Sequence, residues 1–136
     1  MIQPIIRDMM FLSQPSQNAA PADRQVITDL VDTLNAHLDD CVGLAANMIG
    51  VQKRIIAVRM GPVSVAMVNP EIVRQSGEYE TEEGCLSLSG VRKCKRWEKI
   101  EVTFQDASFL PRRATYSGWI AQIIQHEIDH CSGVLI

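Results

Sequence analysis

The 136-residue sequence is short of several features, and each shortage argues against a class of protein. It has 13 Lys and Arg residues against 16 Asp and Glu residues, so its net charge is −3 and it lacks the positive field that holds a nucleic-acid backbone. The longest nearly apolar stretch, residues 42–51, is too short for a membrane span of about 20 residues. The N-terminal apolar run contains Arg7 and Asp8 and is not followed by a small-residue cleavage site, unlike a signal peptide. We therefore expect a cytoplasmic protein that binds neither nucleic acid nor membrane.

The four cysteines also lack a recognisable pattern. None forms a Cys-x-x-Cys pair, so neither a zinc knuckle nor a redox dithiol is indicated. Disulfides are disfavoured in a reducing cytoplasm, which leaves thiols free for other chemistry. Internal repeats and long Gly/Ser linkers are missing too, so the sequence predicts one domain over residues 1–136.

Hydrophobic periodicity predicts a mixed fold. Apolar residues at helical spacing indicate an amphipathic helix from Asp23 to Leu38, with Asp23 as its cap. Strands are expected at 54–59 and 63–68, the second ended by Asn69-Pro70, and again at 77–88 and 99–106, with Ser89-Gly90 as the turn between them. The pattern favours an α+β protein with a small, mostly antiparallel sheet.

The last helix, predicted to start at Ser117 and to end at Gly133, carries the most information. Its apolar side chains form two neighbouring stripes, one of them containing Trp119, Ile123, His126 and His130. A helix that is apolar over so much of its circumference is buried. Its histidines and acids are therefore carried toward the interior, where polar groups need partners.

The string His126-Glu127-Ile128-Asp129-His130 matches the HExxH motif. Positions i and i+4 project two imidazoles about one turn apart, close enough to share one metal ion. Glu127 lies beside them, placed to accept a proton from a water molecule on that ion. The alternative is a pair of core histidines satisfied by ordinary hydrogen bonds.

A third protein ligand must come from upstream, because few residues follow His130 and Cys131 points about 100° away around the helix. Apart from carboxylates, the candidates are His37, Cys41, Cys85 and Cys94. Cys85 stands out, since it follows an acidic strand and Gly84 allows another element to approach closely.

Three segments resemble the signature motifs of the peptide deformylases, in the same order. They are GLAANMIG at 43–50, EGCLS at 83–87 and QHEIDH at 125–130. The resemblance implies an α+β fold in which small antiparallel sheets surround a buried C-terminal HExxH helix. It also implies one Fe²⁺ ion, replaceable by Zn²⁺ or Ni²⁺, held by Cys85, His126 and His130, with Glu127 as the acid/base.

The implied reaction is hydrolysis of the formyl group from the N-terminal formylmethionine of nascent peptides. The backbone N–H of Leu86 is expected to stabilise the oxyanion, and the first motif places Gly43, Leu44 and Met48 at the substrate. Helical spacing puts three further residues on the face of His126, where they are candidates for the wall of a methionine pocket, although core packing explains them equally well: Trp119, Gln122 and Ile123.

The first motif departs from the family pattern. Met48 stands where the family has Gln, and a thioether has no N–H to donate to an oxyanion, a loss worth about 10²–10³ in turnover. Asn47 could substitute only if it pointed in the same direction. Cys41 replaces a Gly, and a second sulfur ligand is the alternative for that thiol. The basic C-terminal helix of some relatives is missing, so ribosome docking is not expected.

Three functions compete. The first is a metal-dependent deformylase with activity reduced by Met48. The second is a non-catalytic paralogue that keeps the metal for stability or peptide binding. The third is an amide hydrolase that acts on a different acyl-peptide. An intact Glu127 favours the first function, because a structural metal site has no use for a general base, whereas Met48 favours the second.

Overall fold

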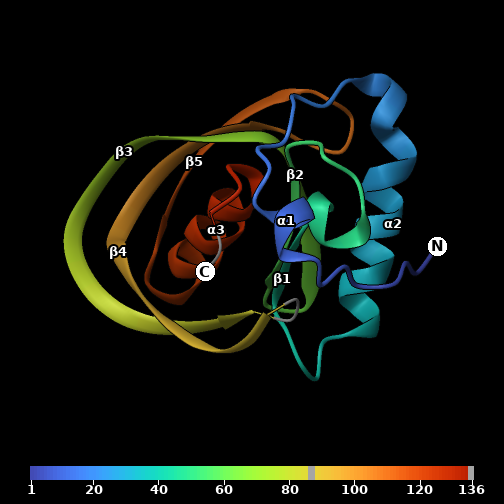
Figure 1. Ribbon diagram of the computed structural model, residues 1–136. Helices are drawn as coiled ribbons and strands as arrows, with labels where there is room; N and C mark the ends of the chain where they lie inside the picture. Colours follow the sequence, from blue (N-terminus) through green and yellow to red (C-terminus); the bar gives the residue numbers. More distant parts are fainter. Residues whose placement is uncertain (86–87, 135–136) are drawn as a thin grey trace.

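The computed structural model describes residues 1–85 and 88–134. Its centre is a five-stranded antiparallel sheet in the order β1-β2-β3-β4-β5. The strands, listed in order, are Gly43–Ala45, Ile55–Met60, Val63–Cys85, Leu88–Gln105 and Pro111–Ser117. The expected α+β class is confirmed, and the antiparallel strands are joined into one sheet that curves around the C-terminal helix (Figure 1).

The curvature comes from β3 and β4, which are far longer than the predicted strands. Their pairing is shifted between Val68 and Glu71, between Ile72 and Arg74, and again between Gly84 and Cys85. Irregularities of this kind bend a strand and increase its twist. The bent hairpin can therefore wrap one face of the sheet around a helix.

The prediction that Asn69-Pro70 ends a strand was wrong. Asn69 adopts a left-handed conformation with φ 50°. Its side chain accepts the N–H of Ala19 and donates to the carbonyl of Ala19 and to Gln105. These bonds stabilise an irregularity in the ladder, and β3 continues through it.

The predicted turn at Ser89-Gly90 was also misplaced. Cys85 at the end of β3 pairs with Leu88 at the start of β4, and residues 86–87 lie outside the described residues. Ser89 and Gly90 already belong to β4. The sequence analysis missed β1, β5 and the first half of β4, where short length or dense charge obscures the alternation that marks a strand.

Two helices lie on opposite faces of the sheet (Figure 1). Helix α2, Arg24–Ala36, is confirmed within two residues of its predicted ends and packs Ile27, Leu30 and Leu34 into the core. Asp23 does not cap it, because its carboxylate accepts the N–H of Ala20 across the short 3-10 turn η1, Pro21–Asp23. The two other short elements are α1, Met9–Leu12, and the 3-10 turn η2, Ala46–Ile49.

Helix α3, Gly118–Cys131, occupies the concave face. Gly133 ends it with φ 77° and donates its N–H to the His130 carbonyl, as expected, whereas the Ser117 side chain makes no capping bond. The burial of Trp119 was wrongly predicted, since 62% of that residue is exposed. Neither α3 nor any other helix in residues 1–85 and 88–134 has the length and hydropathy to cross a bilayer.

Candidate active site

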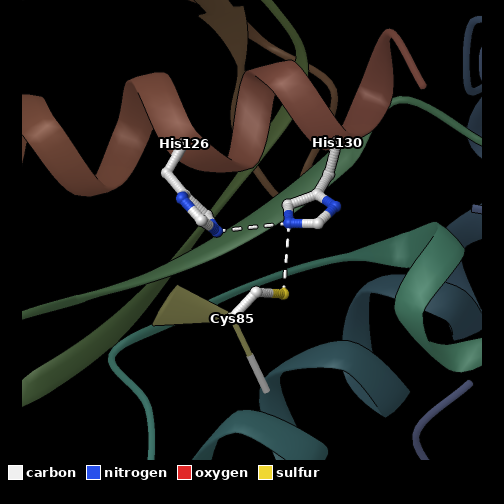
Figure 2. A group of neighbouring side chains, drawn as sticks. All are labelled: Cys85, His126 and His130. Atoms are coloured by element: carbon white, nitrogen blue, oxygen red, sulfur yellow. Dashed lines mark hydrogen bonds between the residues drawn. The ribbon is translucent and has the colours of Figure 1, made fainter. Parts of the chain in front are cut away.

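Three side chains converge beneath α3 (Figure 2). His126 and His130 stand one helical turn apart, with their Nε2 atoms 3.2 Å from each other. Cys85, at the end of β3, places its Sγ 3.3 Å from the Nε2 of His130. The motif on α3 and the cysteine on the sheet are therefore brought together, as expected from the sequence.

The arrangement fits one metal ion. The Cys85 sulfur and the two imidazole nitrogens all lie within 4.8 Å of one another. In a tetrahedral site with metal bonds of about 2.0–2.3 Å, neighbouring ligand atoms are separated by roughly 3.3–3.6 Å. Within the described part of the chain, Cys41 is not a member of this group, so the structure gives no support to a second sulfur ligand.

Glu83 orients the first histidine. Its Oε1 accepts the Nδ1–H of His126 at 2.8 Å, which leaves the Nε2 of that ring free to bind an ion. Arg96 donates to both oxygens of Glu83 and also to Asp129. Burial raises the pKa of Glu83, but the bonds from His126 and Arg96 outweigh it and hold that pKa well below its usual value.

The two imidazoles titrate in opposite directions. Burial lowers the pKa of His126, but its bonds to Cys85 and Glu83 outweigh burial and raise it to about 10. Burial and the charge of His126 lower the pKa of His130 to about 3. His130 is therefore neutral, while His126 must release a proton from Nε2 before it can bind an ion.

Glu127 lies between the histidines and the first motif. It is almost fully buried, and its Oε1 has no hydrogen-bond partner among the described residues. Burial raises its pKa to about 7. Gly43 permits the close approach of β1, because a Cβ at that position would lie 3.0 Å from Glu127 Oε2 and 2.8 Å from Ile123 Cγ2. An unpartnered carboxylate of this pKa is suited to exchanging protons near neutral pH.

A cavity of about 790 Å³ opens onto these groups. Most of the residues expected at the substrate line it, and they are listed here: Gly43, Met48, Trp119, Gln122 and Ile123. Leu44 does not line it, because its side chain is completely buried in the core. Leu86 lies outside the described residues.

The first motif contributes no amide to the cavity. Met48 lines the wall, and its sulfur accepts the N–H of Ala45 at 3.4 Å. Asn47 points away, because its amide donates to the carbonyl of His130 at 2.9 Å. Cys41 also lines the cavity, and burial raises the pKa of its thiol to about 12, which keeps it neutral.

Arg96 and the role of Glu83 were missed by sequence reasoning. Glu83 belongs to the EGCLS motif, so its position beside a candidate ligand was available as a signal. Arg96 is one of several basic residues in a charged segment that showed no strand pattern. In the strand pairing Arg96 faces Tyr79, four residues before Glu83, and the hydrogen bonds of its guanidinium to Glu83 show that the two side chains meet.

The family model for polypeptide deformylase matches residues 4–136. This chain belongs to the peptide deformylase family. It is 54% identical to a peptide deformylase of Clostridium beijerinckii over the full length of both chains, and 40% identical to one of Thermoanaerobacter pseudethanolicus over 81% of this chain and 69% of that protein. The motifs recognised in the sequence thus identify the family, and the enzyme is a metallohydrolase of the deformylase type.

Solved deformylase structures share the fold. The crystal structure of the Thermotoga maritima peptide deformylase superposes with a TM-score of 0.90 at 28% identity and covers 99% of this chain and 95% of that one. An Acinetobacter baumannii deformylase bound to Met-Ala-Ser gives a TM-score of 0.88 at 26% identity, covering 99% and 97%. The curved sheet around α3 is therefore the architecture of deformylases.

Proposed function

We propose that this chain, as one catalytic domain over residues 1–136, removes the formyl group from the N-terminal methionine of nascent peptides. The observation that carries the proposal is the convergence of Cys85, His126 and His130 at the base of a cavity, beside Glu127, whose Oε1 has no hydrogen-bond partner among the described residues. Family membership supports the same reaction. The four free cysteines agree with a cytoplasmic location.

We assign the two histidines and Cys85 as ligands of one Fe²⁺ ion, which Zn²⁺ or Ni²⁺ can replace. One thiolate and two imidazoles suit each of these ions. When bound, the ion supplies Lewis acidity toward the formyl carbonyl and the attacking water. Glu83 and Arg96 keep the ring of His126 turned toward it.

Glu127 moves the protons. Its free Oε1 takes a proton from the water as the oxygen of that water bonds to the formyl carbon. The same carboxyl then returns a proton to the departing nitrogen as the C–N bond breaks. The products are formic acid, which gives up its proton to water and becomes formate, and a peptide with a free amine, and Glu127 ends in its starting state.

The methionine side chain of the substrate fits the apolar part of the cavity. Ile123 and Trp119 supply its wall, and Gly43 lines the cavity beside them. The expected contact of the developing oxyanion with the N–H of Leu86 remains part of the proposal. Met48 offers no donor at the opposite wall, so we propose that turnover is lower than with an amide there.

The Oε1 of Glu127, which no group in residues 1–85 or 88–134 bonds, favours catalysis over a purely structural metal site. A buried acceptor without a partner costs about 1–3 kcal/mol, and a site that only stabilises the fold has no reason to keep it. A non-catalytic relative would more simply carry a neutral side chain at this position.

Formate release from a formyl-methionyl tripeptide tests the proposal. The protein is purified without oxygen and loaded with Fe²⁺ or Ni²⁺, and Glu127→Ala is measured beside it. We expect turnover in the parent and its loss in the variant, with ion content unchanged in both. Full ion loading without formate release would overturn the proposal, and turnover on acetyl-peptides instead would reassign the chain to another acyl group.

A further inference from the structure

Gln122 connects the wall of the cavity to the candidate metal ligands. It lies one turn before His126 on α3 and lines the cavity. Its Nε2 donates to Glu83 Oε2 at 2.8 Å, and its Oε1 accepts the hydroxyl of Tyr79 at 3.4 Å. A polar amide in the wall of the cavity is therefore bonded on both sides, and neither bond involves solvent.

The bond to Glu83 completes the set of donors around that carboxylate. Oε1 accepts from His126 and Arg96, and Oε2 accepts from Arg96 and Gln122. Glu83 and Gln122 both line the cavity, so the bond between them lies in its wall. Gln122 and Arg96 therefore share the task of holding Oε2, and together they limit the rotation of the Glu83 carboxylate.

The orientation of the Glu83 carboxylate affects the candidate metal ligand His126. His126 bonds to the other oxygen of the same carboxylate at 2.8 Å. A carboxylate that rotates about its Cγ–Cδ bond moves both oxygens together, so loss of the bond at Oε2 loosens the bond at Oε1. Partners of this kind set the orientation and basicity of a ligating imidazole.

We propose that Gln122 is a positioning residue for the deformylase reaction, acting on His126 through Glu83, so that the pocket wall and the metal ligands form one hydrogen-bonded unit. The inference rests on the proposed function and deepens it, because it assigns a role in ion binding to a residue that also lines the cavity. Tyr79 is the outer member of the unit and acts through the longer bond.

Binding of Co²⁺ to the metal-free protein tests the role without relying on activity. Gln122→Leu removes both bonds, and Gln122→Met removes them while keeping the length of the side chain. The matched control is Gln52→Leu, which removes a surface bond from Gln52 to Gln14 of 2.6 Å far from the cavity. Dissociation constants are measured by chelator competition, and the visible absorption spectrum reports the geometry of the bound Co²⁺.

We expect both Gln122 variants to weaken Co²⁺ binding about 10-fold or more and to alter the spectrum, in line with the 10–100-fold effects of other partners of ligating side chains. Tyr79→Phe should change both in the same direction by a smaller factor, and Gln52→Leu should change neither. If one Gln122 variant fails to fold, the other and Tyr79→Phe carry the test.

Co²⁺ affinity and spectrum equal to the parent in a folded Gln122 variant would overturn the inference. A change confined to KM for the tripeptide would then make Gln122 a part of the pocket wall only. Failure of the parent to release formate would count against the proposed function, whereas the Co²⁺ measurements would still decide the role of Gln122.

Discussion

The two walls of the cavity are built on different principles. The wall formed by α3 and the end of β3 carries, besides the apolar Trp119 and Ile123, polar groups that are bonded to one another: His126 to Glu83, Glu83 to Arg96 and Gln122. The wall formed by β1 and η2 presents Cys41, Gly43 and Met48, which offer neither an amide nor a charged side chain. Hydrogen bonds fix the positions of the polar side chains in the first wall, whereas the second wall is defined by the size and packing of its side chains.

The two walls correspond to two different requirements of the reaction. Holding an ion and moving a proton need fixed orientation, which charged hydrogen bonds supply. Stabilising the oxyanion from the opposite side needs a donor, and Met48 is not one. One half of the site brings together three candidate metal ligands and a carboxylate that orients one of them, whereas Cys41, Gly43 and Met48 in the facing half supply no charged side chain and no side-chain amide.

The largest expected effect comes from breaking the polar wall at its ligand. Cys85→Ala leaves two imidazoles, so ion affinity should fall by more than the 10–100-fold typical of residues that only support a ligand. Formate release should fall with it and should not recover at moderate ion concentration. Chelator competition with Co²⁺ checks this, and Cys131→Ala, which removes a buried thiol outside the candidate ligand group, should keep the ion affinity of the parent.

Glu83→Gln is expected to weaken ion binding about 10–100-fold. The amide keeps the shape but loses the charge that fixes Arg96 and accepts from His126. The exposed Glu80, on the same strand, provides the control variant Glu80→Gln. Ion affinities of the two variants that cannot be distinguished would contradict the role assigned to Glu83.

The apolar wall is tested by filling it. Gly43→Ala places a Cβ within 3.0 Å of Glu127 and Ile123, so one of them must shift. We expect a loss of about 1–3 kcal/mol in the free energy of unfolding, typical of overpacking, together with lower kcat. Urea denaturation and formate release measure the two effects. Gly84→Ala, whose Cβ would meet its nearest neighbour at 3.6 Å, should leave the unfolding free energy much closer to that of the parent.

The smallest effect is expected far from both walls. Asp106 accepts the N–H groups of Leu110 and Ser108 and a bond from Arg112, and these lower its pKa below 3.8. A lowered pKa means that the carboxylate stabilises the fold above its unfolded pKa and that this contribution is lost as pH falls through the folded pKa.

Asp106→Asn should therefore lower Tm slightly at pH 7 and reduce the difference in Tm between pH 5 and pH 3. Thermal unfolding at several pH values measures this, with formate release at pH 7 expected to stay constant. If the Tm of the variant falls between pH 5 and pH 3 as much as that of the parent, the Asp106 carboxylate does not contribute to the acid dependence of stability.

The polar wall was predictable where its residues share one element. His126, Glu127 and His130 lie on a single helix, so their spacing alone places them together. Arg96 was not predictable, because its meeting with Glu83 depends on the register of two long bent strands. The course of β3 through Asn69 was equally hidden, since a left-handed residue stabilised by side-chain bonds leaves no periodic signal.

In the wall formed by β1 and η2, the sequence shows which residues are present but not the direction in which their side chains point. The sequence reveals that Met48 is not an amide, but only the structure shows that Asn47 turns away to bond the carbonyl of His130. It also shows that Leu44 is core, although its neighbour Gly43 lines the cavity. Alternation along a three-residue strand decides which side chains face the substrate, and that direction depends on packing.

The most direct test of the account is the rate of formate release by Met48→Gln, compared with Met48→Leu, in protein loaded with the same ion. The account predicts that Gln adds a donor to the apolar wall and raises kcat by up to about 10²–10³ without changing ion affinity, while Leu does not raise it. A kcat for Met48→Gln equal to or below that of the parent, at equal ion content, would contradict the claim that the facing wall lacks only a donor.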